Sequence, residues 1–219
     1  FNGFGREWEC ALTTTESEGK ARARGVVLKE RDVENARRVH LSIAQAVPKG
    51  DKMDFVLQKG TELGVMEFWP FDAERSVSKI GFDEDGGERA AMRTARWRRI
   101  VEGAAAQCGR ADVPIVHSIA DLATVVDYGT SGARCLMLDE AEETISLREA
   151  LKRDPIEWDD EAPPRVMLLV GPEGGWAPRE REWATRYGAE SVGLGARILR
   201  TETAALVAAA ILGWEAGDL

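Results

Sequence analysis

Two short, uninterrupted apolar runs constrain the fold of this chain more than any other feature of its sequence. They are Cys135–Leu138 and Val166–Val170, and such runs without polar alternation are typical of strands that are covered on both faces. The spacing of apolar residues predicts helices at Ser146–Arg153 and Pro178–Tyr187, between such strands. Strands that alternate with helices predict an α/β domain with a mostly parallel sheet.

The same alternation extends along most of the chain. We expect further elements at Lys52–Leu63 (helix), Val65–Phe71 (strand), Glu88–Cys108 (long helix), Glu190–Leu194 (strand) and Thr201–Trp214 (helix). The last helix is apolar nearly all round, and this predicts that it is deeply buried.

The first part of the chain has a different pattern. Polar segments separate three short strands that we expect at Trp8–Leu12, Ala21–Lys29 and Val39–Ala46, and a linker is expected at Pro48–Gly50. An all-β piece of this length is below the size at which a core usually stands alone, so we expect an upstream segment to be missing or disordered. The predicted organisation is a small β domain at residues 1–48 and an α/β domain at residues 49–219.

Composition narrows the function classes. The formal net charge is −9, from 38 acidic and 29 basic residues, which argues against a nucleic-acid coat protein. The segment Glu88–Arg110 nevertheless holds six arginines and two glutamates and can contact a phosphate backbone. Three scattered cysteines and two histidines argue against a disulfide framework or a metal site, and they favour a reducing cytoplasm. No apolar stretch approaches the length of a membrane span.

A glycine-rich turn, Gly171–Gly175, directly follows the second apolar run. Glycines let the backbone approach a ligand closely at the strand end where open sheets bind ligands. The turn has neither the lysine of a phosphate-binding loop nor the spacing of a dinucleotide fingerprint, and Glu173 at its centre would repel phosphate. The sequence therefore favours a nucleoside-like ligand without phosphate, with positive charge as an option, and a tight turn without a ligand is the alternative.

A second strand runs into a glycine turn at Gly193–Gly195, and the chain continues through Arg197 and Arg200 into the last helix, with Thr201 as its expected N-cap. Consecutive strands tend to be neighbours, so we expect the two turns to lie side by side. Capping and surface ion pairs are the alternative role for this segment. Two such turns so close in sequence instead suggest one pocket at adjacent strand ends.

The long helix combines arginines with an aromatic residue. Trp97 shares a helical stripe with Ile100 and Val101, so we expect it in the core rather than stacked on a base. The arginine face of this helix, together with Arg75 after the preceding strand, is the candidate surface for RNA phosphates.

Six segments in sequence order resemble the RsmE family, the bacterial methyltransferases of uridine N3 in small-subunit (16S) ribosomal RNA. The segments are Lys52–Asp54 with Gln58–Val65, Glu74–Ser76, Arg96–Ile100, Gln107–Arg110, Gly171–Gly175 and Leu194–Ala204.

The resemblance implies a SPOUT-type fold, an α/β domain with a trefoil knot near its carboxyl end, preceded by an incomplete PUA-like β-barrel that binds RNA. It also implies S-adenosylmethionine bound in the knot, S-adenosylhomocysteine as product, no metal, and a homodimer with the active site at its interface. The implied partner is 16S rRNA or the small ribosomal subunit.

Carried onto this sequence, the resemblance implies one set of cofactor-binding residues. They are Leu138, Val170, Gly171, Pro172, Glu173, Gly174, Gly175, Gly193, Leu194, Gly195, Ile198, Leu199, Arg200, Thr201 and Thr203. We predict that four arginines contact the phosphate backbone of the RNA, namely Arg75, Arg96, Arg99 and Arg110.

The chemistry suggests two catalytic residues. Uridine N3 is a poor nucleophile until its proton leaves, and an arginine against O2 or O4 would stabilise the developing negative charge. We hypothesise that Arg200 plays this part and that Glu202 positions it or relays the proton, because both directly follow the second turn. A purely structural Arg200, capping the helix or pairing with Glu202, is the alternative.

Two other functions stay open at this point. One is a ribose 2′-O-methyltransferase of the same superfamily, because the cofactor turns alone do not report the target atom. The other is a non-catalytic RNA-binding factor in ribosome assembly.

Overall fold

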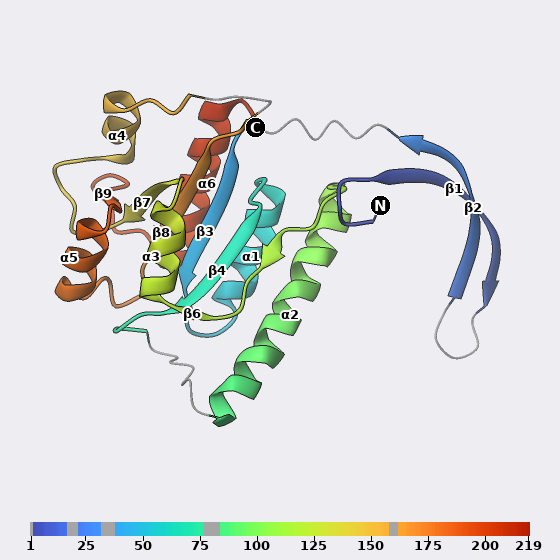
Figure 1. Cartoon of the computed structure of the whole chain (residues 1–219), viewed down its shortest axis with the longest axis horizontal. Helices are drawn as coiled ribbons and strands as arrows, with labels where there is room; N and C mark the ends of the chain where they lie inside the picture. Colours follow the sequence, from blue (N-terminus) through green and yellow to red (C-terminus); the bar gives the residue numbers. More distant parts are fainter. Residues whose placement is uncertain (1, 17–21, 32–37, 77–83, 158–161) are drawn as a thin grey trace.

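The computed structural model describes residues 2–16, 22–31, 38–76, 84–157 and 162–219 (Figure 1). An antiparallel ribbon of β1 (Glu7–Glu16) and β2 (Arg22–Arg31) projects away from the rest of the molecule. The other strands form one parallel sheet in the order β5-β4-β3-β8-β7-β9, and β6 also pairs with β4. Their bounds are β3 (His40–Ala46), β4 (Glu67–Asp72), β5 (Ile115–Val116), β6 (Ala120–Asp121), β7 (Arg134–Leu138), β8 (Arg165–Val170) and β9 (Glu190–Val192).

Helices cover both faces of this sheet. Their bounds are α1 (Lys52–Glu62), α2 (Glu84–Cys108), α3 (Leu122–Thr130), α4 (Leu147–Arg153), α5 (Pro178–Arg186) and α6 (Thr201–Ala216). On one face, Leu168 shares a core with Trp97 of α2 and Leu212 of α6. On the other, Met167 shares a second core with residues of α3 and α5. The predicted α/β fold with a doubly covered parallel sheet is therefore confirmed, whereas the threading of the chain into a knot stays a prediction.

The strand β3 corrects the predicted organisation. The sequence placed Val39–Ala46 with the N-terminal strands, but β3 pairs in parallel with β4 and β8 in the middle of the sheet. Six of its seven residues are buried. An apolar strand gains most from burial when both its faces and both its edges are covered. The α/β part therefore begins before His40, and the boundary expected after residue 48 is wrong.

Two helices differ from the prediction. The helix α3 was not predicted from the sequence; its N-cap Asp121 accepts a 2.7 Å hydrogen bond from the backbone N–H of Thr124. The helix α6 was expected to be deeply buried, yet Ile211 and Trp214 are 36% and 72% exposed. Its opposite face, with Ala208 and Leu212, is fully buried against the sheet. Among the described residues, no helix combines the length and apolar character that a membrane crossing needs.

The buried carboxylate of Glu67 connects several segments at the amino edge of the sheet, where the amino ends of the parallel strands lie. The Nε2 atoms of His40 and His117 lie 2.7 and 2.8 Å from the two oxygens of Glu67. Trp69 Nε1 and the hydroxyl of Tyr128 also donate to this carboxylate, at 3.1 Å. Burial alone would raise the pKa of Glu67, but these hydrogen bonds outweigh it and hold the pKa well below its ordinary value.

This cluster predicts a stability that depends on pH. We expect Glu67→Ala to lower the free energy of unfolding by about 3 kcal/mol at neutral pH, because it leaves buried donors unpaired. Since the pKa of Glu67 is lower in the folded chain, the unfolded chain takes up the proton first on acidification. The stabilisation is therefore complete above the ordinary glutamate pKa of about 4.3 and declines below it.

Denaturant unfolding of both proteins between pH 7 and pH 3 measures this difference. Glu62→Ala, which removes a partly exposed partner of Lys59 on α1, serves as the control and is expected to cost less than about 1 kcal/mol. A wild-type advantage over Glu67→Ala that stays constant down to pH 3 would contradict the prediction.

Candidate active site

A pocket of about 570 Å³ opens at the carboxyl ends of β7, β8 and β9. Four parts of the chain form its wall. They are Lys52 of α1, the end of β7 with the loop that follows it, the first glycine turn, and the second glycine turn with the start of α6. The lining residues are Lys52, Leu138, Asp139, Glu140, Glu142, Val170–Gly175, Gly193–Thr201 and Ala204. The two turns thus line one cavity, as the sequence predicted.

Strand register accounts for this meeting of the turns. Leu138 is paired with Val170 on one side and with Val192 on the other. Three strands therefore end side by side, and the chain leaves each of them at the same edge of the sheet. This edge is where open parallel sheets bind their ligands.

A buried aromatic side chain at the end of the first turn fixes the turn to β7. Trp176 is buried, and its Nε1 donates a 2.8 Å hydrogen bond to the carbonyl oxygen of Leu138. Gly175 has a φ of +67°, and a Cβ at this position would collide with the carboxylate of Glu140. The positive φ favours glycine at this position, and the absence of a Cβ leaves room for the Glu140 side chain beside the turn.

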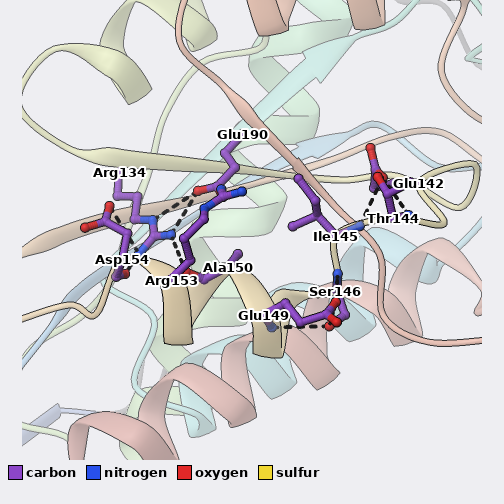
Figure 2. A network of polar contacts seen from close by, with 10 residues as sticks. All are labelled: Arg134, Glu142, Thr144, Ile145, Ser146, Glu149, Ala150, Arg153, Asp154 and Glu190. Atoms are coloured by element: carbon purple, nitrogen blue, oxygen red, sulfur yellow. Dashed lines mark hydrogen bonds and ion pairs between the residues drawn. The ribbon is translucent and has the colours of Figure 1, made fainter.

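The second turn is joined to the same loop by backbone hydrogen bonds. The N–H of Gly193 donates to the carbonyl oxygen of Ile145 at 2.8 Å, and the N–H of Leu147 donates to the carbonyl oxygen of Gly193 at 2.9 Å. A Cβ on Gly193 would lie 2.5 Å from the carbonyl oxygen of Glu142, so only glycine allows this approach. Figure 2 shows that the Glu142 side chain in turn accepts hydrogen bonds from the backbone of Thr144 and Ile145.

The far end of this loop is fixed by α4. Ser146 and Glu149 form a reciprocal capping box at the helix start (Figure 2). Arg134 donates to Glu190 of β9 at 2.9 Å and to the carbonyl oxygen of Ala150 in α4 at 3.0 Å. The loop that forms one wall of the pocket is therefore held at both ends.

A buried chain of hydrogen bonds connects the two turns beneath the pocket. The hydroxyl of Thr201 donates to the carbonyl oxygen of Gly171 at 2.6 Å and accepts from Gln45 Nε2 at 2.9 Å. A hydroxyl has one proton, so Gln45 must present its NH₂ group to Thr201. The sequence predicted Thr201 as the N-cap of α6, but the N-cap is Arg200, and its side chain makes no capping bond.

The surroundings of Glu173 differ from those expected from the sequence. Its carboxylate, expected to repel phosphate and to allow a positive ligand, accepts hydrogen bonds from Lys52 Nζ at 2.9 Å and from the backbone N–H of Lys49 at 3.0 Å. Burial would raise the pKa of Glu173, but these hydrogen bonds lower it below its ordinary value. The negative charge is thus already balanced by a lysine of the protein.

Of the expected catalytic pair, Arg200 lines the pocket and Glu202 does not, and the expected cofactor residue Thr203 does not line it either. Arg200 lines the pocket and is exposed to it, and the mostly buried Glu202 follows in the first turn of α6. Thr203 is exposed and does not line the pocket, whereas Thr201 and Ala204 do. Successive helical residues are rotated by about 100°, so Thr203 lies on a different side of α6 from these neighbours.

Sequence reasoning assigned no role to several pocket residues. These are Lys52, Asp139, Glu140, Glu142, Ala196, Arg197 and Ala204. The residues after β7 could have been predicted at the pocket, because they follow the apolar run Cys135–Leu138. The carboxyl ends of parallel strands lie at one edge of the sheet, so the residues after each strand lie close together. Lys52 belongs to a segment that resembles the family, but nothing in that segment indicated that it reaches the pocket from a helix far away in sequence.

The four arginines assigned to RNA differ in their surroundings. Arg96 and Arg99 are exposed on α2, and the exposed Arg75 donates to the carbonyl oxygen of Gly174 at 3.3 Å. Arg96 pairs with Asp54 of α1, which brings it close to the helix that carries Lys52.

The assignment of Arg110 to RNA is not supported. Its side chain is only 10% exposed, and its Nη1 donates to the carbonyl oxygens of Thr61 and Val65 at 2.7 and 2.8 Å. Its Nη2 lies 2.9 Å from Asp112. The Nη groups donate to backbone carbonyls between α1 and β4 and to Asp112, and Nε is buried, so the guanidinium group is not accessible to a phosphate.

Comparison with known proteins identifies the class and then the family. A model of the RNA methyltransferase domain matches residues 35–213. The chain is 33% identical over 177 residues to Ribosomal RNA small subunit methyltransferase E of Bacillus subtilis, covering 81% of this chain and 66% of that protein. It is also 33% identical over 217 residues to the protein of the same name from Mycobacterium tuberculosis, covering 97% and 76%. The chain belongs to the RsmE family of RNA methyltransferases.

Solved structures agree with this assignment. The structure of Ribosomal RNA small subunit methyltransferase E from Neisseria gonorrhoeae bound to S-adenosyl methionine superposes with a TM-score of 0.82 at 34% identity, covering 98% of this chain and 81% of that one. A methyltransferase from Legionella pneumophila in complex with the cofactor SAM gives 0.81 at 30% identity, with the same coverage. The chain spans about two thirds of the Bacillus relative's length.

Proposed function

We propose that this chain methylates N3 of a uridine in 16S ribosomal RNA, with S-adenosylmethionine as the methyl donor. The observation that carries the proposal is the pocket between the two glycine turns, in a fold that superposes over 98% of the chain with a relative bound to that cofactor. The three cysteines are free thiols, which supports a reducing compartment, the bacterial cytoplasm, as the place of action.

The pocket residues fit such a cofactor. Gly195 lines the pocket, and a Cβ there would meet no protein atom within 4 Å, so a ligand can lie against this backbone. Leu138 and Leu194 offer apolar surface for a purine ring, and the carboxylates of Glu140 and Glu142 suit a ligand with ammonium and sulfonium charges. When bound, the cofactor supplies an electrophilic methyl group for in-line displacement, so the main task of the protein is alignment.

The side chains of this chain then act on the uracil. Arg200 lies exposed in the pocket and donates to a uracil carbonyl oxygen, where negative charge grows as the N3 proton leaves. Glu202 follows in the first turn of α6 and positions this arginine or accepts the proton. The side chain of Arg200 makes no capping hydrogen bond to α6.

Arg200→Ala tests this assignment. We expect methyl transfer to purified small ribosomal subunits to fall at least about 100-fold, because charge stabilisation in the transition state is lost. Cofactor affinity, measured by calorimetry, should change by less than about threefold. Arg186→Ala, on the exposed side of α5, is the control and should retain wild-type activity.

Nucleoside analysis of the product RNA identifies the methylated atom. We expect 3-methyluridine, whereas a 2′-O-methyl nucleoside would contradict the proposed target. Near-normal transfer by Arg200→Ala would remove this residue from the chemistry.

The RNA surface that we propose combines the exposed arginines of α2 with Arg75. Both Arg75 and Arg96 contact residues at the pocket or on the helix that borders it, namely Gly174 and Asp54. An RNA that lies along these arginines would therefore reach the pocket. The ribbon of β1 and β2 is proposed to belong to a PUA-like domain that adds to this surface.

Arg96→Glu/Arg99→Glu measures the contribution of α2. We expect RNA affinity to fall at least about tenfold near 0.1 M salt and its salt dependence to become shallower, because fewer phosphate contacts release counterions. Cofactor binding should be unchanged. Arg148→Glu/Lys152→Glu introduces the same charge change on exposed positions of α4 and should leave the affinity within about threefold. Equal losses in the two variants would place the RNA elsewhere.

We further propose that the chain forms a homodimer through α6. Val207, Ile211 and Trp214 lie at helical spacing on one exposed stripe of this helix, and Phe55 on neighbouring α1 is 47% exposed. Exposed apolar side chains that share one surface are typical of an interface between protein chains.

Ile211→Glu/Trp214→Glu should dissociate such a dimer, because it buries two charges without partners. Sedimentation equilibrium is expected to give the monomer mass for this variant and twice that mass for the wild type. Leu28→Glu, at an exposed apolar position of the ribbon, should keep the wild-type mass. A monomeric wild type would contradict the proposal.

A further inference from the structure

The feature that the proposed mechanism leaves unused is the side chain of Lys52. It is the first residue of α1, lines the pocket and is 30% exposed. Its Nζ lies 2.9 Å from Glu173 and 3.7 Å from Glu202. The hydrogen bond to Glu173 raises the pKa of Lys52 above its ordinary value, so the side chain carries its charge at neutral pH.

The two carboxylates near Lys52 come from different segments of the chain. Glu173 belongs to the first turn, and Glu202 belongs to α6 immediately after the second turn. One ammonium group within reach of both compensates their negative charges and holds the two segments together. The Glu173 oxygen that Lys52 contacts also accepts the backbone N–H of Lys49, so the cation is itself held in place.

Glu202 has few other contacts that could orient it. Its Oε2 is buried and has no hydrogen-bond partner within the described part of the chain. Within the same described residues, this oxygen forms an ion pair with Lys52. Arg200 lines the same pocket as Lys52 and stands two residues before Glu202, at the N-cap of α6.

We propose that Lys52 is a positioning residue for methyl transfer, and this inference rests on the proposed function. Its ammonium group, held by Glu173, fixes the carboxylate of Glu202 next to Arg200 and so sets the arginine toward the uracil. The lysine acts through Glu202 and leaves the cofactor site itself intact.

Lys52→Met, Lys52→Arg and the control Lys59→Met test the proposal. Lys59 lies on the same helix, pairs with Glu62 and does not line the pocket. In single-turnover transfer to small subunits at saturating cofactor, we expect Lys52→Met to be at least about tenfold slower, because alignment is lost. Lys52→Arg should recover to within about threefold of the wild type, and Lys59→Met should equal it. Cofactor affinity should change by less than about threefold throughout.

A double-mutant cycle separates positioning from general destabilisation. In the Glu202→Gln background, Lys52→Met should slow the reaction by less than about twofold more, because the lysine acts through Glu202. Lys52→Gln, measured in parallel, keeps the comparison valid if Lys52→Met folds poorly. Full activity of Lys52→Met, loss of cofactor affinity alone, or independent effects in the cycle would each overturn the proposal. An inactive wild type would overturn the proposed function as well, whereas an active wild type confines any failure to Lys52.

Discussion

The common end of three parallel strands is the constraint on which the site depends. Leu138, Val170 and Val192 stand in register, so the chain must leave β7, β8 and β9 at one edge of the sheet. Trp176, the backbone of Gly193 and the hydroxyl of Thr201 then fix the three departing segments to one another. The contacts that hold these segments together are made by backbone groups and buried side chains.

The two edges of the sheet carry different kinds of polar group. At the amino edge, the carboxylate of Glu67 is surrounded by donors from three separate segments and stabilises the fold. At the carboxyl edge, charged groups such as Lys52, Glu140 and Arg200 line a cavity. Glu202, whose Oε2 lies 3.7 Å from Lys52 Nζ, has at this oxygen no hydrogen-bond partner within the described residues. A buried polar group without a partner is costly, and such groups concentrate where a protein binds a ligand.

The parts of the fold that could be predicted were those with a local cause. The run Val166–Val170 is apolar throughout because both of its faces are covered, and that pattern is visible without knowing the neighbours. The strand His40–Ala46 was also recognised, but its partners were not, because a strand's own pattern does not say which strands lie beside it. The site shows the same limit, since Arg110 proved to bind backbone carbonyls and Glu173 to hold a lysine.

The sequence by itself determined the alternation of strands and helices, the two glycine turns and the family, because periodicity, backbone freedom and motif order are local properties of the chain. Tertiary structure alone decided that Lys52 faces Glu173, that Thr201 bridges Gln45 and Gly171, and that one side of α6 stays uncovered. These pairings join residues far apart in sequence. Their geometry follows from strand register and helix packing, which no short stretch of sequence encodes.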